Sequence, residues 1–208
     1  MTLTRKSPLQ SHKSALKAGE KKLRTRKCAI KGCGVRFAPR SITHKACGPE
    51  HAALIAADKR EQEERRESRV RKEALKKRSD WLRETQTVFN QYRREWCKQN
   101  GFHTCPCCGI PLDWTGNGVD AGHYRSVGSA PHLRFTEHNV WAQRKQCNRY
   151  GAGRAVDYRI GLIALIGREA VEALESDNTP RKWTITELKA LKAEYSAKLK
   201  ALLAKAEG

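Results

Sequence analysis

Closely spaced cysteines are the feature that most limits how this chain can fold. The sequence contains eight cysteines, and several lie within a few positions of one another, as in "CAIKGC" at 28–33 and "CPCC" at 105–108. Short segments of this kind bury too little apolar surface to fold alone, so they usually depend on disulfides or on a bound metal. Because the N-terminus lacks the apolar core of a signal peptide, we expect metal binding in a reducing compartment.

The first group of cysteines predicts a small zinc-finger module over residues 28–52. Cys28 and Cys33 are followed by Cys47 and His51, which gives two pairs of ligands for a tetrahedral zinc ion. A metal would have to supply much of the folding energy of so short a segment. The alternative is a set of scattered cysteines with an incidental histidine, and the paired spacing favours the zinc module.

The second group is one ligand short of a complete zinc site. Cys105 and Cys108 form a C-x-x-C pair, but Arg144 stands where Cys147 would have its own partner. Three thiolates with a water would make a weaker and more open site than four cysteines. We therefore expect structural zinc here too, although whether zinc occupies the site stays open. Arg144, in place of a cysteine, could impair the site. The fourth ligand has four candidates: Cys107, Cys97, His103 or water.

The net charge predicts an anionic polymer as the partner. The 208 residues carry a formal charge of +20 with a pI near 9.9, which favours nucleic acid. A basic protein of the membrane surface is the rival class, but no apolar run is long enough to span a bilayer. Residues 1–27 hold nine Lys or Arg and one Glu, and they predict a disordered basic tail.

Helices are predicted on both sides of the second cysteine group. A long charged helix is expected from Ala52 to about Lys98, and residues 59–78 of it, with ten basic and five acidic side chains, should be exposed. Ser79 or Asp80 could cap a new helix with an apolar core face. That face would consist of Trp81, Leu82, Val88, Phe89, Tyr92 and Trp96.

The C-terminal region predicts two further helical segments. The first should break near Gly167, and the second should begin at Thr184 or Thr186 as its cap. One face of the last helix is apolar, and we expect it to pack on the rest of the domain or on a second copy of the chain. Its residues are Leu188, Leu191, Tyr195, Leu199 and Leu202.

The candidate chemical centre lies in a loop-rich stretch between these helices. Hydrolysis of a phosphodiester needs a general base with a near-neutral pKa, and a histidine such as His123 can serve. It also needs a hard cation with few protein ligands, for which Asp120 and Asn148 are suited, while Asn139 could orient the histidine ring. Four basic residues of the same stretch could meet DNA phosphates: Arg125, Arg134, Arg144 and Lys145.

These residues resemble a known family. A C-x-x-C pair, the sequence "DAGH", an Asn and a second cysteine followed by Asn resemble the HNH nuclease motif. More narrowly, "DAGHYRS", "APHLRFTEHN", "QCN" and the tail "RKWTITELKALKAEY" resemble the NinG (Rap) family of lambdoid phage recombination proteins. The resemblance runs from about Cys28 to Lys200 and departs from the family pattern at Arg144.

The resemblance implies a structure-selective DNA endonuclease that cleaves branched recombination intermediates, four-way junctions and D-loops, with Mg²⁺ or Mn²⁺. It implies that His123 is the general base, that Asn139 orients it, and that Asp120 and Asn148 contact the catalytic metal. The alternative is a non-catalytic, zinc-containing protein that binds DNA junctions. We expect no membrane partner, a possible homodimer through the C-terminal helix, and a location in the cytoplasm of the host bacterium.

The expected fold class is α+β and mainly helical. It would combine the zinc finger, the long basic helix, a ββα-metal (HNH-like) core and C-terminal helices. The corresponding boundaries are 1–27 for the tail, 28–52 for the finger, 53–98 for the charged helix, 99–155 for the core and 156–208 for the C-terminal helical region.

Overall fold

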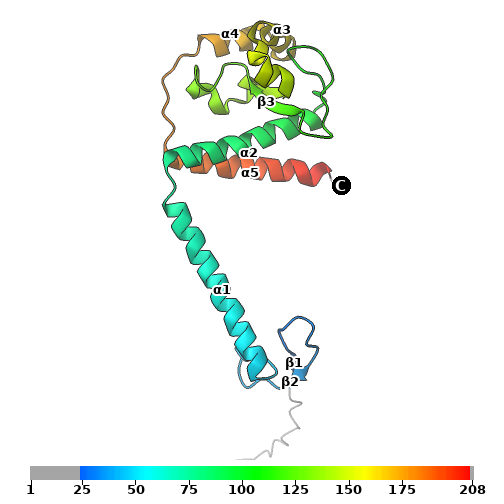
Figure 1. Ribbon diagram of the computed structural model, residues 1–208, viewed down its shortest axis with the longest axis vertical. Coiled ribbons are helices and arrows are strands. Elements are labelled where there is room, and N and C mark those ends of the chain that lie inside the picture. Colours follow the sequence, from blue (N-terminus) through cyan, green and yellow to red (C-terminus); the bar gives the residue numbers. More distant parts are fainter. Residues whose placement is uncertain (1–23, 207–208) are drawn as a thin grey trace, which may run out of the picture. The chain divides into compact units, whose positions relative to one another are not determined.

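The structure is a computed structural model that describes residues 24–206 (Figure 1). It divides into two compact units, one up to Glu73 and the other from Ala74 onward. Apart from residues 24–27, the predicted basic tail lies outside the described residues.

The first unit contains a minimal β-hairpin and one long helix. Strands β1 (Arg26–Lys27) and β2 (Arg36–Phe37) pair antiparallel, and helix α1 (Pro49–Ala74) follows them. None of the residues of α1 is buried, and ion pairs such as Arg65–Glu61 lie along its exposed surface. The prediction of a solvent-exposed charged helix is confirmed, because a helix with so few apolar residues has no face to bury.

The segment expected to be a long helix forms two helices. Helix α1 ends at Ala74, and helix α2 (Arg78–Gln99) begins after three non-helical residues. The backbone N–H of Lys77 donates to Asp80 Oδ2 at 3.0 Å, so Asp80 caps α2 from its first turn rather than from the N-cap position. The long helix expected from Ala52 to about Lys98 is therefore divided, close to Ser79 and Asp80, where the sequence suggested that a new helix could begin.

In the second unit, α2 packs along helix α5 (Ile185–Ala206), as Figure 1 shows. Thr184 and Glu187 form a reciprocal capping box at the start of α5, which confirms Thr184 as the cap. The apolar stripes predicted for both helices form one core, in which these residues are buried: Trp81, Phe89, Tyr92, Phe135, Val140, Trp183, Leu188 and Tyr195.

A two-stranded hairpin lies next to α2. Strand β3 (Val119–His123) pairs antiparallel with β4 (Val140–Arg144), and Asp120 faces Gln143 in the register. The connection contains the 3₁₀ helices η1 (Pro131–Phe135) and η2 (Glu137–Asn139), and the short π-helix η3 (Gln146–Tyr150) follows β4. Two strands and a helix thus follow one another in the expected order, while the HNH character of this core stays a prediction.

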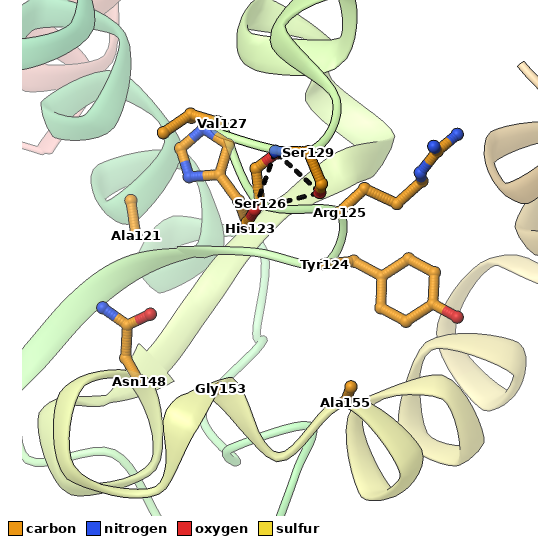
Figure 2. A pocket seen from close by; sticks show the side chains of 10 residues that line it. All are labelled: Ala121, His123, Tyr124, Arg125, Ser126, Val127, Ser129, Asn148, Gly153 and Ala155. Carbon is orange, nitrogen blue, oxygen red and sulfur yellow. Dashed lines mark hydrogen bonds between the residues drawn. The ribbon is translucent and has the colours of Figure 1, made fainter. Parts of the chain in front are cut away.

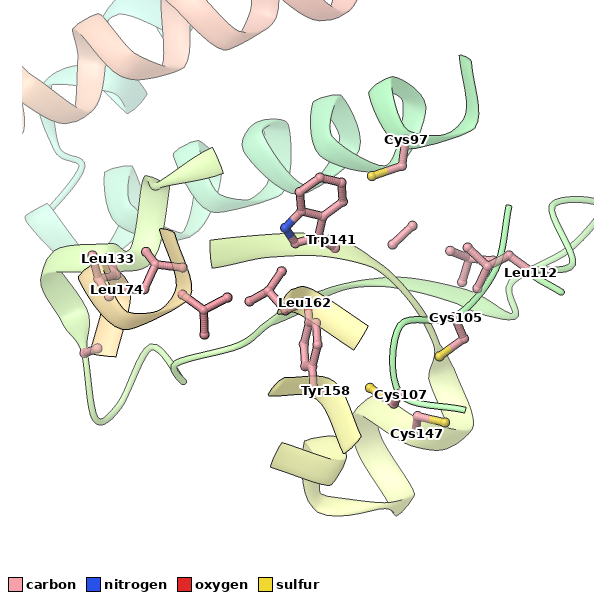
Figure 3. Close-up of a cluster of buried hydrophobic side chains, with 14 residues drawn as sticks. Cys97, Cys105, Cys107, Leu112, Leu133, Trp141, Cys147, Tyr158, Leu162 and Leu174 are labelled. Carbon is pink, nitrogen blue, oxygen red and sulfur yellow. The ribbon is translucent and has the colours of Figure 1, made fainter. Parts of the chain in front are cut away.

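The remaining helices cover the other side of the hairpin. The 3₁₀ helix η4 (Ala152–Arg154) leads into α3 (Ala155–Ile166), and α4 (Arg168–Ser176) follows the break at Gly167, where φ is +85°. Figure 3 shows the core beneath them, in which Tyr158 and Leu162 of α3 meet Trp141 of β4 and several of the cysteines. The predicted break at Gly167 is confirmed.

The fold is mainly helical, with two small antiparallel sheets, as expected. Within residues 24–206, no helix is long and apolar enough to cross a membrane.

Candidate functional site

The first cysteine cluster fits a tetrahedral zinc ion. The ligand atoms of Cys28, Cys33, Cys47 and His51 all lie within 4.8 Å of one another. His51 Nδ1 is 3.4 Å from Cys28 Sγ and 3.2 Å from Cys47 Sγ, and the sulfurs of Cys33 and Cys47 are 3.7 Å apart. A tetrahedral site with zinc–sulfur bonds of about 2.3 Å has sulfur–sulfur edges of roughly 3.7 Å, so the sulfurs already have the spacing that zinc needs.

The electrostatics of this cluster also favour a cation. A hydrogen bond from the backbone at Ile30, helped by contacts with Cys47 and His51, lowers the pKa of Cys28 to about 6. A thiolate is therefore available at neutral pH, and thiolates rather than thiols bind zinc. The structure supports the predicted ligand set, and the identity of the ion stays a prediction.

The second cluster contains three close sulfurs and a guanidinium. The ligand atoms of Cys105, Cys108 and Cys147 lie within 4.8 Å of one another, with 3.6 Å between the sulfurs of Cys147 and Cys108. Arg144 stays at the cluster: its backbone N–H donates to Cys105 Sγ at 3.5 Å, and its Nη1 lies 3.9 Å from Cys108 Sγ. The guanidinium therefore supplies positive charge where a fourth ligand would otherwise stand.

No fourth protein ligand joins the second cluster among the residues with a described position. The Cys107 sulfur accepts a hydrogen bond from Gln143 Nε2 instead, and Cys97 is buried in the core beside Trp141, as Figure 3 shows. His103 packs edge-on against Trp114. The three sulfurs could hold an ion only together with an outside ligand such as water, as one of the expected alternatives has it.

His123 stands at the end of β3 with one ring nitrogen engaged. Its Nε2 lies 3.1 Å from the backbone carbonyl oxygen of Arg134. A carbonyl can only accept, so Nε2 carries the proton, and Nδ1 is left with its lone pair. Gln86 Nε2, at 3.5 Å, is a second donor and therefore not the partner of this nitrogen. The fold thus fixes the tautomer in which Nδ1 can act as a base.

The surroundings keep the His123 ring neutral. Burial lowers the pKa of His123 below its ordinary value of 6.5, and the nearby Arg134 cation lowers it further. The hydrogen bond to the Arg134 carbonyl acts in the opposite direction but does not outweigh burial. A histidine that is neutral at pH 7 can accept a proton.

Asp120 and Asn148 approach each other from β3 and η3. Asn148 Nδ2 donates to Asp120 Oδ2 at 3.1 Å, and Arg149 donates to both carboxylate oxygens, with Nε 2.8 Å from Oδ2 and Nη2 3.4 Å from Oδ1. Burial alone would raise the pKa of Asp120, but the hydrogen bonds from Arg149 and Asn148 lower it. The carboxylate is therefore ionised, and together with the amide oxygen of Asn148 it suits a hard cation that keeps several waters.

Asn139 holds the loop rather than the histidine ring. It is fully buried, its Nδ2 donates to the backbone oxygens of Arg125 and Leu133, and its Oδ1 accepts from the N–H of Arg125. The direct bond to His123 that we expected is replaced by an indirect one. Asn139 fixes the connection that contains Arg134, whose carbonyl in turn orients the ring.

His123 and Asn148 line the same cleft, and Figure 2 shows them on opposite sides of it. Its volume is about 590 Å³, enough for a phosphate group with its neighbouring sugars, and the residues around it also include Tyr124, Arg125 and Ser126. Asp120 reaches this cleft only through Asn148. The structure thus places His123 and Asn148 at one cleft, leaves Asp120 outside its lining but bonded to Asn148, and buries Asn139 away from it.

The four basic residues expected at DNA have different surroundings. Arg125 donates to the backbone oxygens of Leu174, Glu175 and Asp177 at the end of α4, so its guanidinium is used within the fold. Arg134 lies beside His123, and Arg144 lies at the second cysteine cluster. Lys145 is near enough to Asp120 to help lower the pKa of that carboxyl.

Two residues of the site were missed from the sequence. Arg149 directly follows Asn148, and its position in the site could have been inferred from that adjacency. Gln86 lies on α2, far away in the sequence, and is brought to His123 and Arg134 only by tertiary packing. A single glutamine in a charged helix carries no sequence signal of this role.

Comparison with known proteins places the chain among phage proteins. Residues 20–206 match the family described as bacteriophage lambda NinG protein. Protein ninG of Escherichia phage lambda is 37% identical over 197 residues, which covers 85% of this chain and 93% of that protein. The proteins of the same name from Escherichia phage 933W and Salmonella phage P22 are each 36% identical with the same coverage. No solved structure matches the chain.

Proposed function

This chain belongs to the NinG family of bacteriophage proteins, and we propose that it is a metal-dependent DNA endonuclease that cleaves branched recombination intermediates. The observation that carries the proposal is the cleft that His123 and Asn148 both line: the Nε2–H of His123 is engaged by the Arg134 carbonyl, and Asn148 is hydrogen-bonded to the ionised Asp120. A protein that only binds DNA has no need of a neutral, oriented histidine opposite a carboxylate and an amide.

Each residue has a defined task in this proposal. Asp120 and Asn148 would hold a divalent cation, Mg²⁺ or Mn²⁺, through one carboxylate and one amide oxygen. When bound, the cation would stabilise the charge that develops on the phosphate. His123 Nδ1 takes a proton from the attacking water, while Nε2–H stays on the Arg134 carbonyl and keeps the ring in place.

The charge distribution supports DNA as the substrate. Residues 24–48 of the first unit contain seven Lys or Arg and no acidic residue, whereas the basic and acidic side chains of α1 are equal in number. Such a surface binds the phosphate backbone without reading bases, which suits a nuclease that recognises the shape of a junction. Zinc in the first cluster, and a weaker site in the second, would stabilise the fold without taking part in the reaction.

The alternative is a non-catalytic protein that binds branched DNA. It is favoured by Arg144, which occupies the position of a zinc ligand, and by Arg149, which engages the Asp120 carboxylate. In each case a guanidinium lies against groups that would otherwise bind a metal ion. A test of DNA cleavage is therefore needed to choose between the two functions.

A homodimer is part of the proposal, because resolution of a four-way junction needs two symmetric cuts. We expected the apolar face of the C-terminal helix at its interface. Leu188 and Tyr195 of that face are buried in the core shared with α2 of the same chain. The interface of the proposed dimer must therefore use another surface. We also propose that the protein acts in the cytoplasm of the host bacterium.

Cleavage of a labelled four-way junction tests the enzyme. With Mg²⁺ or Mn²⁺ and matched binding, the wild-type chain should cut, and His123→Ala should bind equally but cut at least about a hundredfold more slowly, the usual contribution of a general base. His138→Ala is the matched control, because His138 is exposed and lies just beyond the site. Equal cutting by wild type and His123→Ala would exclude the proposed role, and binding without cutting by the wild type would favour the alternative.

A further inference from the structure

Arg134 is a half-buried cation without an acidic partner. Its Nη1 donates to Gln86 Oε1 at 3.2 Å, and no carboxylate lies within ion-pair distance of it in the described part of the chain. Gln86 is itself held on α2, where its Nε2 donates to Asn90 Oδ1 at 2.7 Å. The side chain that positions this arginine is therefore neutral and fixed in orientation.

Such an arrangement is unfavourable in the free protein. Partly burying a guanidinium without a counter-ion costs free energy, and proteins usually avoid this with a carboxylate. Here a second cation is also near, since Arg78 at the start of α2 contributes, after burial, to a lowered pKa of Arg134. The charge of Arg134 thus stays unpaired, although a single change of Gln86 to Glu would give it a carboxylate partner.

We propose that Gln86 is a positioning residue which keeps Arg134 unpaired as the binding site for a DNA phosphate beside His123. The proposal rests on the proposed function for the identity of the polymer. Arg134 would act twice: its guanidinium takes the phosphate, and its backbone carbonyl holds His123 Nε2–H. Phosphate and base would therefore be placed by the same short helix, η1, and α2 would supply the amide that aims the guanidinium.

The test compares two replacements of Gln86 of similar size. Gln86→Glu introduces a carboxylate at the position of Oε1, which should pair with Arg134, whereas Gln86→Met removes the acceptor and leaves the guanidinium charged. Binding of a four-way junction is measured from low to high salt. We expect Gln86→Glu to bind about tenfold more weakly at low salt and to lose about 0.9 from the slope of log K against log salt, the value for one phosphate contact.

Two further variants separate phosphate binding from a structural role. Arg134→Gln should reproduce the lost slope with an unchanged or higher melting temperature, and Arg134→Lys should restore part of the affinity. Arg83→Gln is the matched control. Arg83 is an exposed arginine of α2, the helix that carries Gln86, and it pairs with Asp80. The proposal would be overturned if Gln86→Glu and Arg134→Gln kept the wild-type slope of log K against log salt. It would also be overturned if Gln86→Glu and Gln86→Met lost affinity and stability to the same extent.

The outcome does not depend on cleavage. If the wild type cuts, Gln86→Glu should raise KM more than it lowers kcat, because a phosphate contact contributes to binding. If the wild type does not cut, the nuclease proposal fails, and the salt dependence of Gln86→Glu still decides whether Arg134 binds a phosphate.

Discussion

At the scale of single residues, the proposed reaction depends on the protonation state of His123. Two features make the imidazole a base: the Arg134 carbonyl fixes its proton on Nε2, and burial disfavours its charged form. Neither feature involves a residue that sequence patterns associate with catalysis. The chemistry of His123 is therefore determined by its packing as much as by its identity.

The lowered pKa of His123 predicts the pH dependence of cleavage. Because the neutral ring is the active form in the proposed reaction, the rate should rise with pH and reach half its plateau below pH 6.5, the ordinary pKa of a histidine. By linkage, the same group contributes to stability fully above pH 6.5 and loses this contribution as the pH falls through the lower folded value. Single-turnover rates from pH 5 to 8 check the first expectation, and a midpoint above 6.5 would contradict it.

At the scale of elements, α4 is fastened to the hairpin connection by Arg125. Its guanidinium donates to three backbone oxygens at the C-terminus of α4 and to Asn178 Oδ1. These groups lie at the negative end of the helix dipole, where a cation is stabilising. The sequence suggested a contact with DNA, and the structure gives this arginine a role within the fold.

Replacement of Arg125 by Met should therefore act on stability. We expect the free energy of unfolding to fall by about 2 kcal/mol, from the loss of charge-assisted hydrogen bonds to carbonyls that would be left without partners. Urea denaturation followed by circular dichroism measures this change. Lys98→Met, at an exposed position near the end of α2, is the control. Wild-type stability together with weaker DNA binding would show that Arg125 serves the DNA instead.

The elements with regular patterns could be predicted, and those set by tertiary contacts could not. The apolar stripes of α2 and α5, the break at Gly167 and the capping box at Thr184 follow from local rules that act over a few residues. The start of a new helix near Ser79 or Asp80 was also suggested by the sequence, although the exact boundary at Arg78 was not, because both flanking segments favour helix. The roles of Asn139 and Gln86 escaped because their partners lie in other elements that only folding brings close.

At the scale of the whole molecule, each of the two units contains one cluster of residues that could hold a metal ion. The first cluster has four ligands, and the second has three sulfurs and Arg144. The two clusters should therefore differ in affinity, although they share cysteine chemistry. A metal that binds only the folded state stabilises each unit by an amount that grows with the logarithm of its affinity for that cluster.

This difference predicts a zinc content close to one per chain. Purified protein should retain one tightly bound zinc after mild chelation, and Arg144→Cys, which completes the second cluster, should retain two. Cys33→Ser should lose the tight zinc and destabilise the first unit. Elemental analysis with thermal melting measures both effects. Two tightly bound ions in the wild type would show that the second cluster holds metal despite Arg144.

The central claim is that His123 is the general base of a DNA endonuclease, and chemical rescue tests it most directly. Single-turnover cleavage of a four-way junction by His123→Ala would be measured with and without added imidazole, at DNA concentrations that saturate binding. The account predicts that imidazole restores part of the lost rate, because a free base can occupy the space left by the ring. A rate that imidazole leaves unchanged, or a His123→Ala variant as fast as the wild type, would contradict the claim.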